Sequence, residues 1–220
     1  MLQKPLPLIF VLPPLDARQS PAGPRLPVRK LFALEERVAV SFFPKAPVSR
    51  YRLDATSKKA LPAGRAAAYD RALRSRLEQS ARHPGVRAGV QCALSGLPLE
   101  ATAGIGAGGK VVLHNGGDEY GEARDGKKPV TCPPQILRDL RDLAAAGLAD
   151  WPGDVVLNQG SAGNAFITGR QGADALPWVR LEFSRRLWMK TDGTLLAKRV
   201  REFPGRLVSL LTLWCRLQAW

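Results

Sequence analysis

The chain has 220 residues, enough for one domain with a substantial hydrophobic core or for two small ones. Lys and Arg number 33 against 19 acidic residues, so the formal net charge is +14. Hydrophobic residues make up 45% and charged residues 24%, a composition that excludes a disordered chain. No apolar stretch reaches the roughly 20 residues that a membrane-spanning helix needs, which argues against a membrane partner.

The apolar stretch 5–12 predicts a buried first strand, and the proline-rich residues 13–30 predict a loop. The stretch is short and lacks the small-residue cleavage pattern of a signal peptide, so we expect a cytoplasmic protein. Three cysteines, Cys92, Cys132 and Cys215, are widely separated. This spacing argues against disulfides and against a cysteine zinc site, and predicts three small buried side chains.

Further strands are predicted over 37–43, 86–94, 110–114, 154–158 and 178–184, where apolar residues alternate or form short runs. Helical periodicity covers 65–81, the segment from Pro133-Pro134 to a cap at Gly147, and the C-terminal segment 195–220. The order predicts a single α/β domain over 1–220, with a mostly parallel or mixed central sheet and helices on both faces. Functional groups in such sheets gather at the carboxyl ends of the strands.

Four segments, in order, resemble the N-formylglutamate amidohydrolase family. Residues 31–58 resemble the family's "LF … SRYxxDxNR" stretch, and residues 69–73 fall where it has "YHxxL". GVQCALSGLPLE, residues 89–100, falls where the family has a strand ending in "DCHTM". The most specific match is the segment 158–189, which ends in PWVRLEFSRRLWM. The resemblance covers roughly residues 31–190.

The resemblance implies a phosphorylase/hydrolase-like fold, that of zinc hydrolases related to the zinc carboxypeptidases. It also implies zinc ligands after the first strand and at the histidine of "HTM", a glutamate base on a late strand, and an arginine that binds the substrate carboxylate. In this chain the "HTM" histidine is replaced by Ala93 and the preceding aspartate by Gln91. No histidine precedes His83, and Ser57 stands where the clamp arginine would be. We therefore predict no metal ligands and no cofactor.

A few polar positions of the family pattern persist, namely Asn158, Glu182 and Arg185. Glu182 is the candidate base, although we favour a structural role in which it pairs with Arg180, Arg185 or Arg186. Basic residues would make the cleft suitable for a small anion. The candidate substrate- or anion-binding residues are Arg185, Arg52, Lys58 and Asn158, with Arg50 and Arg180 nearby.

Other candidate residues carry weaker signals. His114 lies at a predicted strand end and His83 in a turn, and neither occupies a ligand position of the family; a rebuilt metal site of His114, Asp118 and Glu119 is the less favoured interpretation. The glycine-rich run 104–109 lacks the Lys-Ser/Thr of a phosphate-binding loop. No serine lies in a Gly-x-Ser-x-Gly elbow.

Three functional hypotheses follow. The favoured one is a catalytically inactive member of the amidohydrolase family, a pseudoenzyme that acts as a binding or partner module. The first alternative is a zinc-dependent hydrolase of N-formyl or N-acyl amino acids with a rearranged site. The second alternative is a binder of nucleic acid or acidic protein, although the basic residues are spread along the chain and the Ala, Arg, Gly and Pro content is typical of a GC-rich, bacterial-type genome.

The C-terminal residues 207–220 are unusually apolar for a chain end. Packing of a helix on the sheet and docking of another protein subunit are both consistent with this pattern.

Overall fold

The computed structural model of the protein describes residues 5–11, 27–34, 36–42, 79–80, 82–94, 109–124, 129–159, 176–190 and 192–220. Its described strands form one six-stranded sheet in the order β2-β1-β3-β6-β4-β5. The strands are β1 (Leu6–Val11), β2 (Val38–Phe42), β3 (Ala88–Leu94), β4 (Gly109–His114), β5 (Asp154–Leu157) and β6 (Trp178–Phe183). All neighbouring pairs are parallel except β4 and β6, so the sheet is mixed.

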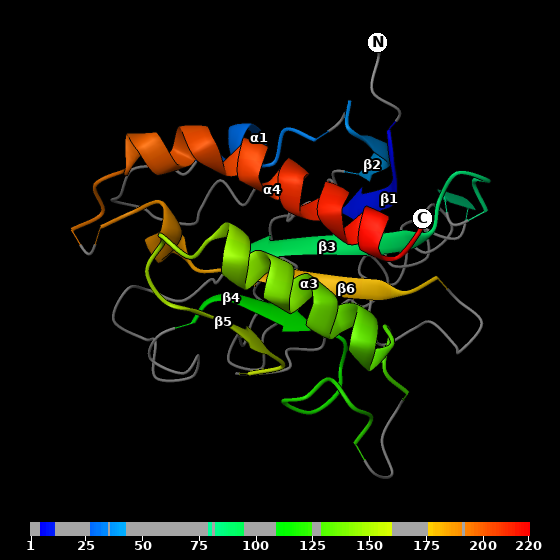
Figure 1. Cartoon of the computed structure of the whole chain (residues 1–220). Helices are drawn as coiled ribbons and strands as arrows, with labels where there is room; N and C mark the ends of the chain where they lie inside the picture. The colour runs from blue at the N-terminus through cyan, green and yellow to red at the C-terminus, as the bar shows by residue number, and fades with distance from the viewer. Residues whose placement is uncertain are drawn as a thin grey trace, which may run out of the picture.

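Two long helices cover one face of this sheet, α3 (Pro134–Gly147) and α4 (Ala197–Leu217) (Figure 1). α3 begins at Pro134, where the missing N–H of proline would be unpaired in any case. Leu137, Leu140 and Ala144 are buried on its inner face at helical spacing. Every second residue of the strands points toward the helices. Val90, Val111 and Leu181, for example, belong to the hydrophobic cluster that includes the buried residues of α3 and α4. The intervening strand residues consequently point to the opposite face.

Aromatic side chains fill the core between the sheet and the start of α4. Phe203 lies 4.8 Å from Trp188 and 5.2 Å from Phe183 between ring centroids, and both pairs are T-shaped. Phe32, which follows the short helix α1 (Val28–Leu31), contacts the same group at 5.6 Å from Phe203. Such edge-to-face pairs are worth about 0.5–1.5 kcal/mol each beyond the area they bury. They fix α4 against the end of β6.

Two cations hold the C-terminal end of α3. The buried Lys110 ammonium donates to the carbonyl oxygens of Leu148 (2.7 Å) and Trp151 (3.1 Å). Arg206 of α4 donates to the carbonyl oxygen of Gly147 at 3.0 Å, and its guanidinium lies 5.1 Å from the centre of the Trp151 ring. Cations are favourable at a helix C-terminus because the last carbonyl groups lack partners within the helix.

The predicted strands are confirmed within a residue or two, and so are the helices at 134–147 and at the C-terminus. The prediction that Gly147 caps α3 is wrong: Gly147 is the last helical residue and Leu148 is the cap, with φ −120°. Residues 28–30 of the predicted loop 13–30 belong to α1, and residues 13–26 lie outside the described residues. Of the predicted helix 65–81 the structure describes only Gln79 and Ser80, so the second helical layer stays a prediction.

The C-terminal segment mainly packs on the sheet. Leu207, Leu211 and Trp214 are buried, whereas Leu213 and Leu217 are 49% and 60% exposed. In the part of the chain that the structure describes, no helix combines the length and apolarity needed to cross a bilayer. The three cysteines are free and buried, as predicted.

The close approach of β3 to β6 depends on Gly89. A Cβ atom at this position would lie 2.2 Å from Cε3 of the buried Trp178 ring. We expect Gly89→Ala to lower the free energy of unfolding by about 1–3 kcal/mol, because neither the ring nor a central strand can move freely. Urea denaturation measures this change.

Gly205→Ala in α4 is the matched control. No atom lies within 4 Å of the methyl group it would add. We expect it to raise the free energy of unfolding by about 0.5–1 kcal/mol, since alanine loses less backbone freedom on folding. Equal stability of the two variants would contradict the tight packing at Gly89.

Candidate functional site

Polar side chains form a row across three neighbouring strands on the sheet face that points away from α3 and α4. The register pairs Gln91 of β3 with Arg180 of β6, and Arg180 with His114 of β4. Glu182 lies two residues further along β6, on the same face. The antiparallel pairing of β4 with β6 brings the carboxyl end of β4 to the middle of β6, which places His114 near Glu182. We call Gln91, His114, Arg180 and Glu182 the polar row.

Glu182 is the centre of this row. Its Oε2 atom lies 3.1 Å from Nη2 of Arg180 and 3.7 Å from Nε2 of His114. The His114 side chain is 6% exposed, whereas Glu182 and Arg180 are 18% and 20% exposed. Both described contacts fall on Oε2. The arrangement is a partly exposed carboxylate held by a guanidinium and an imidazole.

Burial alone would raise the pKa of Glu182. The contact with His114 and the positive charge of Arg180 act in the opposite direction, and together they hold the pKa of this carboxyl below its ordinary value of 4.5. Glu182 is therefore ionised near neutral pH. A carboxylate with a lowered pKa is a good ion-pair partner but a weak general base.

Several buried polar atoms on this face have no hydrogen-bond partner. They are Oε1 of Gln91, Nδ1 of His114 and Nε1 of Trp178, which precedes Arg180 by two residues on β6. Leaving a buried donor or acceptor without a partner costs about 1–3 kcal/mol. Unpaired groups of this kind are rare in folded proteins and gather at functional sites.

The residues of the row do not make a zinc site. A catalytic zinc needs about three protein ligands and an open position. His114 and Glu182 supply two donors, and the Glu182 oxygen nearest to His114 already binds the Arg180 guanidinium. Ala93, at the position of the family's "HTM" histidine, pairs with Glu182 in the β3–β6 register and offers no donor atom. Within the described residues, no three His, Cys, Asp or Glu side chains are grouped to hold a metal.

Cysteine chemistry and the helix side of the sheet offer no better site. Burial raises the pKa of Cys132 and of Cys215 to about 12, which disfavours the reactive thiolates. A cavity of about 10 Å³ lies among apolar side chains between the sheet, α3 and α4. It has room for about one water molecule and none for a substrate.

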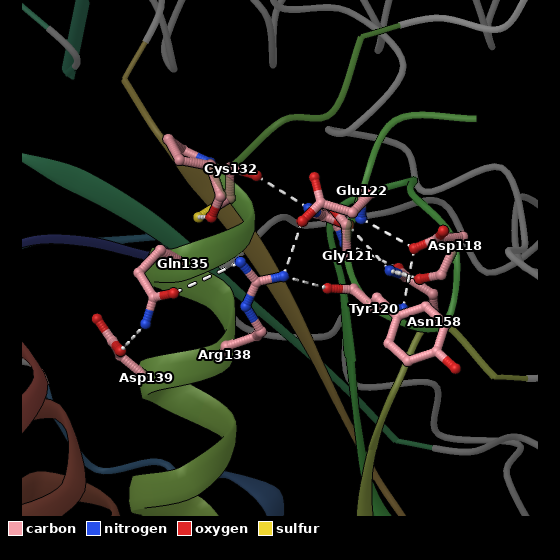
Figure 2. Close-up of polar contacts among 11 residues, drawn as sticks. Asp118, Tyr120, Gly121, Glu122, Cys132, Gln135, Arg138, Asp139 and Asn158 are labelled. Atoms are coloured by element: carbon pink, nitrogen blue, oxygen red, sulfur yellow. Dashed lines mark hydrogen bonds and ion pairs between the residues drawn. The ribbon is translucent and has the colours of Figure 1, made fainter. Parts of the chain in front are cut away.

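Asn158 serves a local structural network rather than the polar row (Figure 2). It follows β5 with a positive φ of 47°, and its side-chain oxygen accepts from the backbone N–H of Asn115 at 3.1 Å. Its amide nitrogen donates to Oδ1 of Asn115 (2.9 Å) and to the carbonyl oxygen of Asp118 (2.6 Å). Both amide hydrogens are thereby used, and the network ties the turn after β4 to the end of β5.

The same turn accounts for Asp118, which was weighed as a metal ligand. Its Oδ1 atom accepts from the backbone N–H groups of Tyr120 and Glu122, both at 2.9 Å. Arg138 of α3 then holds the turn through the carbonyl oxygen of Tyr120 and the carboxylate of Glu122 (Figure 2). These contacts describe a stabilised turn.

The other predicted site residues are placed as follows. Arg185 begins the 3₁₀ helix η2 (Arg185–Leu187), directly after β6, where burial lowers the pKa of its guanidinium. Arg50, Arg52 and Lys58 lie outside the described residues. His83 is exposed, and its Nδ1 accepts from the backbone N–H of Gly85 at 3.2 Å. Asn158, the other described member of the predicted binding set, contacts Asn115 and Asp118.

Comparison with known proteins gives a structural likeness. No protein-family model and no curated protein matches the sequence. Among solved structures, the chain is similar to an N-formylglutamate amidohydrolase from Ralstonia eutropha JMP134, with a TM-score of 0.51 and 16% sequence identity. The superposition covers 97% of this chain and 96% of that one. The two proteins share a fold. At this identity the likeness concerns the fold alone.

The sequence predicted a pair of Glu182 with Arg180, Arg185 or Arg186, and the structure contains the pair with Arg180. Sequence reasoning did not place Gln91 in a site, and it grouped His114 with Asp118 and Glu119 instead of with Glu182. The sequence did contain one signal for His114, because it ends a strand next to two glycines. His114 and Glu182 are 68 residues apart in the chain. Their contact depends on the order and direction of the strands β4 and β6 in the sheet, which no local sequence pattern predicts.

The Glu182 carboxylate should stabilise the fold in a pH-dependent way. We expect Glu182→Gln to lower the free energy of unfolding at pH 7 by roughly 1–3 kcal/mol. Because the folded-state pKa lies below 4.5, this contribution is complete above pH about 4.5 and is lost as the pH falls through the folded-state pKa. Denaturant titrations of both proteins between pH 3 and pH 8 test it.

Glu202→Gln on α4 is the control, because its carboxylate makes surface contacts of 3.7 and 3.8 Å with Arg206 and Lys198. It should change the free energy of unfolding by less than about 1 kcal/mol. A difference between wild type and Glu182→Gln that stays constant down to pH 3 would show that the carboxylate is not stabilised as described.

Asn158 allows its side-chain and backbone roles to be separated. Asn158→Gly and Asn158→Ala both remove the contacts with Asn115 and should cost roughly 1–3 kcal/mol. The alanine variant should be less stable than the glycine variant by about a further 1 kcal/mol, because it keeps a Cβ at positive φ. Chemical denaturation measures both. Wild-type stability of Asn158→Gly would argue for a ligand-binding role instead.

Proposed function

We propose that the protein is an N-formylglutamate amidohydrolase-like scaffold that has lost zinc-dependent hydrolysis and works as a binding module for a small molecule. The shared fold supports the first part of this proposal. The polar row supports the second part, because it gathers buried polar atoms that have no partner among the described residues around a partly exposed ion pair. Such atoms are a cost to the folded chain alone and are offset when a ligand pairs with them.

One observation carries the loss of hydrolysis. In the β3–β6 register Ala93 stands directly beside Glu182, so the two positions that the resemblance assigns to a zinc ligand and to the base are neighbours in space. The alignment of the sequence with the family is thus spatially consistent, and the histidine is replaced by alanine at that place. Glu182 instead contacts Arg180 and His114. A metal-bound water would have neither a site nor a base of suitable strength.

Two further parts of the proposal have weaker support. Leu213 and Leu217 lie four residues apart on α4 and are exposed, which supports contact of segment 207–220 with another protein subunit. The three free, buried cysteines fit a reducing compartment and hence the cytoplasm.

Elemental analysis combined with an assay tests the central claim. Protein purified without chelators and then incubated with zinc should carry far less than one zinc per chain after gel filtration. It should hydrolyse N-formylglutamate no faster than buffer with zinc alone, since no set of described residues is grouped to hold the metal.

The controls separate true turnover from contamination. Turnover by wild type that survives in Glu202→Gln and disappears in Glu182→Gln would favour the rearranged zinc hydrolase and contradict our proposal. One tightly bound zinc per chain would contradict it as well. Binding of DNA that weakens steeply with added salt would instead favour the nucleic-acid alternative.

A further inference from the structure

We propose that the protein forms a symmetric dimer through the outer face of α4, and that the surface docked there is α4 of a second copy of the chain. This inference rests on the subunit contact of segment 207–220 in the proposed function and names the partner. It does not depend on the loss of zinc chemistry. The outer face is defined here by Glu202, Gly205, Ser209, Leu213, Arg216 and Leu217.

Large apolar side chains occupy the C-terminal half of the outer face, and small residues occupy its middle. Leu213 and Leu217 are 49% and 60% exposed, and Tyr120 is the one other large hydrophobic residue exposed in the described part of the chain. Ser209 and Gly205 lie about one and two turns before Leu213 and are exposed as well. No atom lies within 4 Å of the position that a Cβ of Gly205 would occupy, so a side chain of another helix can approach the backbone there.

The two parts of this face are complementary when a second α4 runs antiparallel to the first. With the two-fold axis at Ser209, Leu213 of one copy packs beside Gly205 of the other. The hole that receives Leu213 is bounded by residues 202, 205, 206 and 209, whose i, i+3, i+4 and i+7 spacing is that of knobs-into-holes packing. Arg206 leaves this hole open, because it binds Gly147 and Asp150 on the side of α3. Symmetry repeats the contact on the other side of the axis.

Charges on the outer face fit the same register. Glu202 meets Arg216 of the second copy, because both lie seven residues from Ser209. The Glu202 side chain is 34% exposed even though Lys198 and Arg206 of its own helix lie 3.8 and 3.7 Å away. Its carboxylate can therefore accept a further cation from a neighbouring molecule.

The helix dipole also favours the antiparallel direction. The first turn of α4 contains no acidic residue and carries the exposed Lys198 instead. A cation is unfavourable at the positive N-terminal end of its own helix. In the antiparallel pair Lys198 lies beside the C-terminal end of the other α4, where unpaired carbonyl groups attract cations.

A second copy fits the outer face better than a partner of one charge sign. An acidic helix would pair with Arg216 but would bring a like charge to Glu202, and a basic helix would do the reverse. The antiparallel copy supplies the opposite charge at both places. The formal net charge of +14 opposes self-association at long range. At 0.15 M salt the Debye length is about 8 Å, so this repulsion is screened while contact pairs persist.

Sedimentation velocity of the full chain at about 0.15 M salt is the direct test. A single helix pair is a small interface, so we expect a dissociation constant on the order of 10 µM and a mass that rises from one chain toward two between about 1 and 200 µM. Leu213→Lys should raise the dissociation constant about 10-fold or more, because it places a cation in the contact. Tyr120→Lys is the control: this exposed residue lies outside α4 and its change should leave the dissociation constant within about twofold.

A charge exchange tests the register. Glu202→Arg and Arg216→Glu should each weaken the dimer roughly 3- to 10-fold, because each brings like charges together across the two-fold axis. The double variant has the net charge of the wild type and should recover its dissociation constant. Fourteen residues span about 21 Å of one helix, so the two side chains cannot pair within one copy. Melting temperatures of dilute samples show that each variant folds.

A chain that stays monomeric at every concentration would overturn the inference. A dimer that tolerates Leu213→Lys would do the same, because its contact would lie elsewhere, and so would a double variant no tighter than the single ones. Each of these results leaves the proposed loss of zinc chemistry in place. Stoichiometric zinc would contradict that part of the proposed function without bearing on α4.

Discussion

Burial of one sheet face under α3 and α4 is the constraint on which the rest of the molecule depends. Side chains alternate between the two faces of a strand, so committing Val90, Val111 and Leu181 to the core fixes the direction of every residue between them. A shift of the register by one residue would exchange the two faces and expose the apolar set. The polar row therefore exists because the apolar face is specified so strongly.

The antiparallel pairing of β4 with β6 gives the row its composition. Had β4 been parallel to β6, its carboxyl-terminal His114 would lie near the end of β6 instead of opposite Arg180. The mixed sheet thus joins an imidazole from one strand to a guanidinium and a carboxylate from another. These contacts hold Glu182 as a carboxylate and lower its pKa, which makes it a weaker proton acceptor than the base that the family resemblance implies.

The polar row contains a satisfied ion pair and two buried polar atoms that have no partner among the described residues. The Glu182–Arg180 pair is satisfied and contributes to stability, whereas Gln91 and His114 each keep a buried atom without a partner. Folded chains tolerate such atoms where function requires them. Under the proposed function, this combination serves recognition of a ligand rather than bond cleavage.

The sequence by itself determined the strands, the two long helices, the α/β class and the presence of Ala93 where the family resemblance implies a histidine. These depend on local periodicity and on residue type, which a single chain displays directly. It also indicated that Glu182 points away from Val179, Leu181 and Phe183, because strand alternation is local. Only the tertiary structure decided that Gln91 and His114 flank Arg180, that His114 and Arg180 contact Glu182, and that Asn158 supports a turn instead. Strand order and direction arise from how the whole apolar face is buried, and this is a property of contacts distant in the chain.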